Sequence, residues 1–111
     1  MNQPTSENFR FARLAEASAR LSADAPFDVI FQDGADISGE LYKPVGEDKQ
    51  SPHARDELYI VAAGSGAFNL DGESIAFGSG DLLFVPAHTP HRFERFSDDF
   101  SCWVIFYGAE S

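Results

Sequence analysis

The sequence predicts an all-β protein, an antiparallel sandwich or barrel, with one short helix near the N-terminus. Three observations support this prediction. After Pro26 the chain breaks into short stretches rich in β-branched and aromatic residues, glycine and proline recur between them, and an Asp-Gly pair separates two of the stretches. Regularly spaced short strands with such turn residues are typical of a β-sandwich or barrel.

The first element is expected to be a helix over about residues 7–22. Ser6 can cap its first turn, and Pro26 ends whatever precedes it. We expect residues 1–26 to form a helical segment on the outside of a single barrel domain, residues 27–111. The residues that fall near one face of this helix are Phe11, Leu14, Ser18 and Leu21.

Eight stretches after Pro26 are predicted to be strands, because each is short, rich in β-formers and bounded by turn residues. Asp71-Gly72 lies between the fourth and the fifth and predicts a two-residue hairpin, since both residues tolerate a positive φ. In chain order the stretches are FDVIF (27–31), ISGELYK (37–43), ELYIVAA (57–63), GAFNL (66–70), SIAF (74–77), DLLFV (81–85), HRFERF (91–96) and SCWVIFY (101–107).

The composition limits the size and the partners of the protein. A chain of 111 residues, 43% of them hydrophobic, is most simply one globular domain. Its formal charge is −10; residues 1–23 contain three arginines and two glutamates and sum to +1, so residues 24–111 sum to −11. Such an acidic surface repels phosphate backbones and anionic lipid heads, and we therefore expect neither a nucleic-acid nor a membrane partner.

The cellular compartment is expected to be the cytoplasm. Cys102 is the only cysteine, so the chain cannot form an intramolecular disulfide. The first residues, MNQPTSENFRF, lack the basic start and apolar core of a signal peptide. No apolar run approaches the roughly 18 residues that a membrane span requires.

The three histidines, His53, His88 and His91, lie within 39 residues of one another. His91 begins a stretch in which His91, Phe93 and Arg95 alternate with Arg92, Glu94 and Phe96, so His91 and Phe93 are candidates for the interior. His53 and Glu57 are four residues apart, and in one straight strand their Cα atoms would be roughly 13 Å apart, too far to share a metal ion.

A turn at residues 54–56 would bring the two side chains together, with His53 ending one strand and Glu57 opening the next. A solvated turn and a helix-surface pair are the alternatives. Burial of a carboxylate beside two imidazoles is costly without a cation, and this ligand set suits a mononuclear first-row metal with open coordination positions. We therefore predict that His53, Glu57 and His91 bind one divalent first-row transition metal; iron, manganese, nickel and zinc are not distinguished.

Two motifs in this region resemble those of the cupin superfamily, in particular of its small single-domain members. The segment H53-ARD-E57-LYIVAA-G64 is similar to the second His, the Glu and the final Gly of the first cupin motif. The segment G80-DLLFV-P86-A-H88-TP-H91-RFE-R95 is similar to the second motif at Gly80, Pro86 and His91. The resemblance covers about residues 39–107, and it implies a jelly-roll barrel that holds a metal inside with residues of both motifs.

The chain departs from these motifs at three positions. Ser51 stands at the place of the first His, His88 at the place of a Gly, and Arg95 at the place of an Asn. The serine either leaves an additional position for water or substrate or weakens the site enough to leave it empty. His88 is either an acid-base group over the barrel mouth or an exposed turn residue.

The remaining candidate pocket residues are Tyr59, Phe93 and Trp103, assigned by strand parity, with ordinary barrel core as the alternative. Two functions follow from the resemblance. One is a metal-dependent enzyme, of dioxygenase or isomerase type, acting on a small organic molecule; the other is a non-catalytic cupin that binds a small ligand or has a structural role. We also expect a homodimer, because the aromatic-rich strands exceed what a small barrel hides and small cupins commonly pair.

Overall fold

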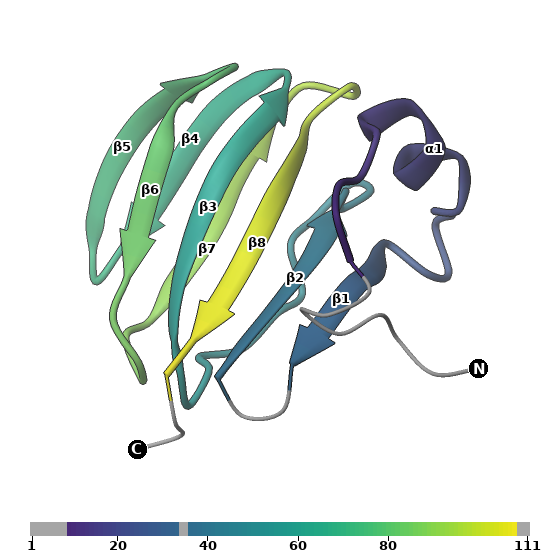
Figure 1. The fold of residues 1–111 in the computed structure, drawn as a ribbon. Helices are drawn as coiled ribbons and strands as arrows, with labels where there is room; N and C mark the ends of the chain where they lie inside the picture. Colours follow the sequence, from purple (N-terminus) through teal and green to yellow (C-terminus); the bar gives the residue numbers. More distant parts are fainter. Residues whose placement is uncertain (1–8, 34–35, 109–111) are drawn as a thin grey trace.

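The protein consists of two antiparallel β-sheets that face each other, with one short helix outside them in the part of the chain described here (Figure 1). The computed structural model describes residues 9–33 and 36–108. The larger sheet has the strand order β1-β2-β8-β3-β6 and the smaller one β5-β4-β7. The strands are β1 (Phe27–Asp33), β2 (Ile37–Tyr42), β3 (Asp56–Ala63), β4 (Ser65–Leu70), β5 (Glu73–Gly78), β6 (Leu82–Val85), β7 (His91–Phe96) and β8 (Ser101–Tyr107).

This architecture confirms the predicted all-β jelly-roll barrel with a short N-terminal helix. Each of the eight predicted stretches overlaps one of the strands, with small differences at the ends. The hairpin between β4 and β5 is also confirmed. Asp71 and Gly72 have φ values of 50° and 93°, as a two-residue hairpin turn with both residues in the left-handed region requires.

The core lies between the two sheets and consists mainly of the inward-facing residues that alternate along their strands. Aromatic rings from both sheets meet at its centre: the ring of Phe93 lies 4.7 Å from that of Phe68 and 5.1 Å from that of Tyr59, centroid to centroid. All three side chains are fully buried or nearly so. The buried residues of this core are Tyr42, Tyr59, Val61, Phe68, Phe77, Leu83, Val85, Phe93, Phe100, Cys102 and Val104.

A bulge interrupts the pairing of β4 with β7 and changes the face on which Arg95 lies. Phe68 pairs with Phe93, but the preceding Ala67 pairs with Arg95, so Glu94 is an extra residue in β7. Arg95 is therefore exposed and does not share the inward face of His91 and Phe93. The strict alternation predicted for this strand is wrong from Glu94 onward.

The helix is shorter than predicted. It spans α1 (Leu14–Ala19) instead of residues 7–22, and Ser6, the predicted cap, lies outside the described residues. Arg13, which precedes the first turn, is extended, and the ring of Phe9 stacks on that of Phe31 at 4.7 Å. This tertiary contact holds the chain before α1 against β1, where helical propensity alone would favour a longer helix.

Helix α1 packs on the outer face of the larger sheet. Ala17 is fully buried there against Ile30 and Leu41. The division into a helical segment, residues 1–26, and a barrel domain, residues 27–111, stays a prediction. Within the described residues, no helix has the length and apolar character needed to cross a membrane.

The core packing can be tested with Phe68→Ala. Phe68 is fully buried and contacts both Tyr59 and Phe93, so the variant should lose about 3–5 kcal/mol of unfolding free energy in a urea titration. The matched control is Phe11→Ala, because Phe11 is 66% exposed. Equal losses in the two variants would contradict the assignment of Phe68 to the core.

Candidate metal centre

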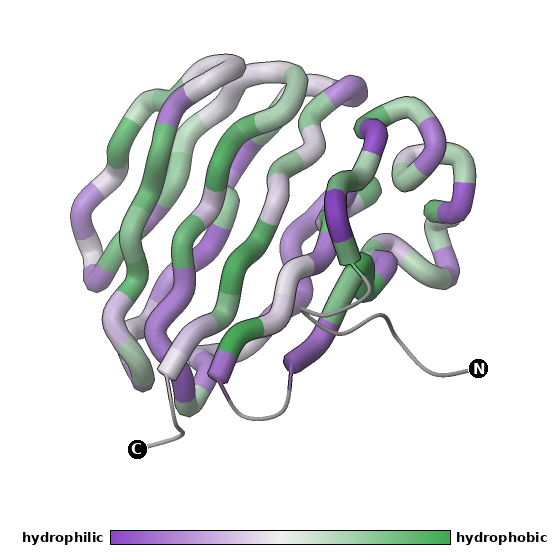
Figure 2. The backbone as a smooth tube through the Cα atoms, viewed as in Figure 1, coloured by the Kyte–Doolittle hydropathy of each residue, from purple (hydrophilic) through white to green (hydrophobic). Residues whose placement is uncertain are grey.

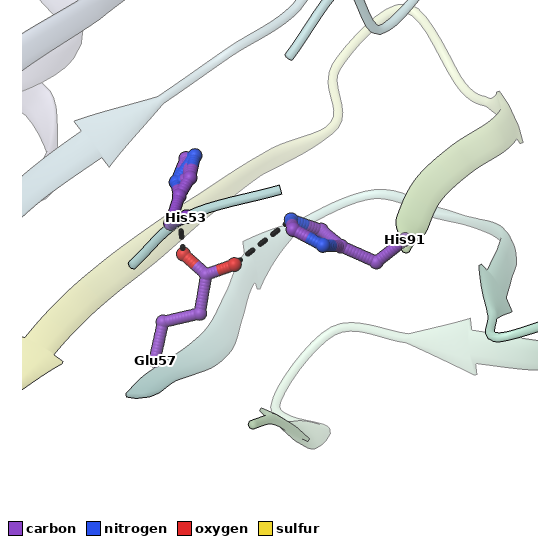
Figure 3. A group of neighbouring side chains, drawn as sticks. All are labelled: His53, Glu57 and His91. Atoms are coloured by element: carbon purple, nitrogen blue, oxygen red, sulfur yellow. Dashed lines mark ion pairs between the residues drawn. The ribbon is translucent and has the colours of Figure 1, made fainter. Parts of the chain in front are cut away.

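The structure brings the side chains of His53, Glu57 and His91 together (Figure 3). One nitrogen or oxygen of each side chain lies within 4.8 Å of those of the other two. His91 Nε2 is 2.8 Å from Glu57 Oε1, and His53 Nδ1 is 3.8 Å from Glu57 Oε2. Glu57 and His91 lie at the starts of β3 and β7. His53, however, lies in the loop after β2, which ends at Tyr42, so the prediction that His53 ends a strand is wrong.

Two buried atoms of this cluster have no hydrogen-bond partner among the described residues: Glu57 Oε2 and His91 Nε2. His91 Nδ1 lies 2.8 Å from the carbonyl oxygen of Thr89, to which it can donate a hydrogen bond. In that neutral tautomer Nε2 carries a lone pair and faces the carboxylate oxygens. A cation between Nε2 and the carboxylate would satisfy both groups, so the donor set fits a divalent metal ion.

A proton on His91 is the alternative to a metal cation. Burial lowers the pKa of His91, but the Glu57 carboxylate and the Thr89 carbonyl together outweigh burial, so the pKa is raised overall. A protonated His91 ring would pair with Glu57 in the metal-free protein. Proton and metal therefore compete for the same nitrogen.

His53 is positioned by its neighbours and forms the open side of the cluster. Its ring stacks on Phe106 with a centroid distance of 5.0 Å and an interplanar angle of 12°. Its carbonyl oxygen accepts a hydrogen bond from the backbone N–H of His88, 2.7 Å away. The side chain is 27% exposed, against 1% for Glu57 and 0% for His91, so solvent reaches the cluster at His53.

Asp48 holds the loop that contains His53 in place through hydrogen bonds. The sequence analysis did not identify Asp48 as a functional residue. The side chain is buried and accepts four hydrogen bonds. The donors are Tyr42 Oη (2.6 Å), the backbone N–H of Gln50 (3.2 Å), Gln50 Nε2 (3.0 Å) and the backbone N–H of Phe93 (2.9 Å). Because Phe93 belongs to β7, Asp48 ties the loop to the strand that carries His91. No local pattern marks Asp48, which lies in a polar stretch typical of a solvated loop.

Tyr59 connects this loop to Glu57. Its hydroxyl lies 3.2 Å from both Gln50 Oε1 and Glu57 Oε1, and it can donate to either. Burial and the negative charge of Glu57 raise the pKa of Tyr59 well above its usual value, so the phenol stays protonated and remains a donor. The Glu57 carboxylate is thus held from the Tyr59 side as well as from His91.

Glu40 adds a further acidic group near the cluster. It lies in β2 opposite the core residue Val104. Burial, and then the charge of Glu57, raises the pKa of Glu40 to about 7. With Asp48 and Glu57 it gives this part of the barrel an excess of acidic groups, which favours a bound cation.

The other predicted pocket residues differ in how deeply they are buried. Tyr59 and Phe93 are buried in the core, whereas Ser51 and His88 are exposed. His88 has a φ of 64°, which explains why its place in the cupin motif is usually a glycine.

Trp103 lies on the opposite face of β8 from the cluster. Its neighbours Cys102 and Val104 both belong to the core, so Trp103 points outward, where it packs with the N-terminal segment. The sequence analysis placed Trp103 on the inward face of its strand, and this prediction is wrong. Phe106 is the β8 residue that reaches the cluster, and nothing in the uniformly apolar sequence of β8 distinguished the two faces.

The hydrogen bonds of Asp48 predict that Asp48→Asn lowers the unfolding free energy, measured in urea, by at least about 2 kcal/mol. In this variant an amide N–H₂ group replaces one of the two oxygens that accept hydrogen bonds, so it faces other donors. Asp99→Asn, at an exposed position, is the matched control and should change the free energy little. An unchanged midpoint for Asp48→Asn would refute the proposed role of the loop.

The raised pKa of Glu40 predicts a pH-dependent stability of the metal-free protein. Between pH 4.5 and about 7 the native state holds the Glu40 proton more tightly than the unfolded state, so stability should fall as pH rises through this range. The unfolding free energy of Glu40→Gln, measured by urea unfolding at several pH values, should fall less steeply with rising pH than that of the wild type. The exposed Glu94→Gln should keep the wild-type slope; equal slopes in all three proteins would exclude Glu40 as a contributor.

A comparison with curated proteins identifies an uncharacterised relative. The chain is 38% identical over 64 residues to the uncharacterised protein SCO3923 of Streptomyces coelicolor. The alignment covers 58% of this chain and 61% of that relative. The chain therefore spans less than two thirds of the relative it matches.

Solved structures show the same fold. Protein NMB1881 from Neisseria meningitidis superimposes with a TM-score of 0.70 at 19% identity, over 89% of this chain and all of that one. The DMSP lyase DddQ from Ruegeria pomeroyi superimposes with a TM-score of 0.60 at 25% identity, over 80% of this chain and 51% of that one. The family model of the cupin domain matches residues 40–106, which include all three clustered side chains and both motifs, from His53 to Arg95. The chain is a member of the cupin family.

Proposed function

We propose that this cupin binds one divalent first-row transition metal through His53, Glu57 and His91 and acts on a small organic molecule. The observation that carries the proposal is a buried cluster of three ligand groups, in which Glu57 Oε2 has no hydrogen-bond partner and His91 Nε2 lies 2.8 Å from Glu57 Oε1. Iron, manganese, nickel and zinc all accept such a ligand set. A dioxygenase or isomerase is the reaction type that we favour.

When bound, the metal would supply a Lewis acid or an oxygen-binding centre, with positions left open by the three-residue ligand set. The protein's own residues shape the surroundings. Ser51 is exposed and lies outside the cluster, so water or substrate would take the place of a fourth protein ligand. Tyr59 offers a phenolic O–H beside Glu57, and the stacked pair of His53 and Phe106 lines the open side.

The enzyme proposal gains support from one structural neighbour, the lyase DddQ, which shares the barrel over half of its own length. The alternative is a non-catalytic cupin that binds a small ligand or has a structural role. The observation that favours the alternative is the near-complete burial of Glu57 and His91, which leaves only His53 open to solvent. Metal content and turnover separate the two functions.

We further propose a cytoplasmic location. The support is a single cysteine, Cys102, that is buried and free, since a reducing compartment suits a protein without disulfides. The partners that we propose are small molecules, because the charge of −10 disfavours nucleic acid and anionic membranes.

The metal site can be tested by elemental analysis of protein purified without chelator or histidine tag. The wild type should contain about one metal ion per chain, and His91→Ala should lose most of it, because one of three ligands is removed. His88→Ala is the control and should keep its metal, since His88 is exposed and outside the cluster.

Urea unfolding of the metal-free proteins accompanies this measurement, so that metal loss is separated from unfolding. Metal retained by His91→Ala at the wild-type level would refute the site. A folded wild type that takes up no metal even from excess would favour the non-catalytic alternative.

A further inference from the structure

A chain of side-chain hydrogen bonds connects Asp48 with the candidate metal ligand Glu57. Gln50 lies between them, because its Nε2 is 3.0 Å from Asp48 Oδ2 and its Oε1 is 3.2 Å from the Tyr59 hydroxyl. That hydroxyl is in turn 3.2 Å from Glu57 Oε1. Strand β3 is hydrophilic at its start and mostly hydrophobic beyond it (Figure 2), so Tyr59 offers a hydroxyl within an otherwise apolar stretch.

The contacts of Asp48 fix the direction in which the Gln50 amide points. Asp48 Oδ2 accepts a hydrogen bond from the backbone N–H of Phe93, and Asp48 Oδ1 accepts one from the backbone N–H of Gln50. Since an ionised carboxylate accepts hydrogen bonds and does not donate them, the amide N–H₂ of Gln50 must face Asp48. Gln50 therefore presents its acceptor oxygen, Oε1, to the Tyr59 hydroxyl.

The Tyr59 hydroxyl has one proton and two acceptors at equal distances. Gln50 Oε1 and Glu57 Oε1 each lie 3.2 Å from the phenol oxygen, and neither can donate to it while Glu57 is ionised. Rotation of the hydroxyl about its C–O bond moves the hydrogen bond from one acceptor to the other and leaves all heavy atoms in place. Because Tyr59 is fully buried, these two oxygens and not bulk water compete for the proton.

The charge on Glu57 decides which acceptor receives this proton. A hydrogen bond to an ionised group is roughly twice as strong as one between neutral groups, so the hydroxyl favours Glu57 as long as that carboxylate keeps its charge. Once Glu57 is neutralised by a bound cation, this advantage is lost, and the amide oxygen of Gln50 becomes the competing acceptor. Without Gln50, the hydroxyl would have to stay on a carboxylate whose charge is already compensated.

We propose that Gln50 is a positioning residue for the candidate metal centre: it accepts the Tyr59 hydrogen bond when Glu57 binds a cation, and it thereby favours the cation-bound state. This inference rests on the proposed metal site and adds a residue outside its ligand set. Asp48 holds the Gln50 amide in the required orientation. The loop after β2 thus contributes to metal affinity through Tyr59 as well as through His53.

The experiment is a double-mutant cycle on zinc affinity, measured by competition with a chromophoric chelator at one pH for all proteins. Gln50→Leu should bind zinc roughly tenfold more weakly than the wild type, because groups that orient a ligating carboxylate contribute on that order. In the Tyr59→Phe background the same change should have no further effect, since no hydroxyl proton is left to accept. Gln32→Leu is the matched control: Gln32 is exposed on β1, and this variant should keep the wild-type affinity.

The cycle separates this role from a purely structural one. A Gln50→Leu change that only loosened the loop would weaken zinc binding equally with and without the Tyr59 hydroxyl, and that result would overturn the proposal. An unchanged zinc affinity of Gln50→Leu would overturn it as well. A wild type that binds no zinc would instead refute the proposed metal site, and this inference with it.

Urea unfolding of the metal-free proteins checks that each variant is folded before its zinc affinity is compared. If Gln50→Leu does not fold, Gln50→Met takes its place in the cycle, because methionine is close to glutamine in length and shape and its sulfur is only a weak acceptor. The expected loss of affinity and its absence in the Tyr59→Phe background are the same for both substitutions.

Discussion

The burial of the Glu57 carboxylate is the constraint on which the rest of the barrel interior depends. An ionised carboxylate among aromatic side chains is unfavourable unless charge or hydrogen bonds compensate it. The protein supplies His91 at 2.8 Å and the Tyr59 hydroxyl at 3.2 Å, and both contact the same oxygen, Oε1. The second oxygen is left without a hydrogen-bond partner in the described residues. This oxygen is therefore available as a ligand to a cation, the role proposed for it above.

The loop after β2 also provides a hydrogen-bond acceptor for the exposed edge of the smaller sheet. Strand β7 is at the edge of the smaller sheet, so the backbone N–H of Phe93 has no strand beside it on that side. Asp48 accepts a hydrogen bond from this N–H and also binds Tyr42 and Gln50. One buried carboxylate thus closes the sheet edge and fixes the loop of His53 relative to the strand of His91. The separation of the candidate ligands is therefore set by contacts within the protein itself.

The strands could be predicted from the sequence because short β-forming stretches and turn residues are local signals. The eight stretches, the hairpin at Asp71-Gly72 and the inward positions of Glu57 and Tyr59 all follow from them. Four features depend on contacts between distant residues and were missed or misplaced. Phe9 stacks on Phe31 and shortens the helix, and the bulge at Glu94 turns Arg95 outward. Asp48 acts through Phe93, and Trp103 lies in a strand whose two faces are equally apolar.

The equal apolarity of the two faces also links the candidate metal centre to the outer surface. Strand β3 alternates Glu57 and Tyr59 inward with Leu58 and Ile60 outward. Because consecutive side chains of a strand share one backbone, a shift of β3 on one face displaces the side chains on the other. Any group that packs over Leu58 and Ile60 would therefore also restrain the backbone that positions Glu57 against His91. The two faces of β3 differ in exposure, because Glu57 and Tyr59 are fully buried whereas Ile60 is 40% exposed.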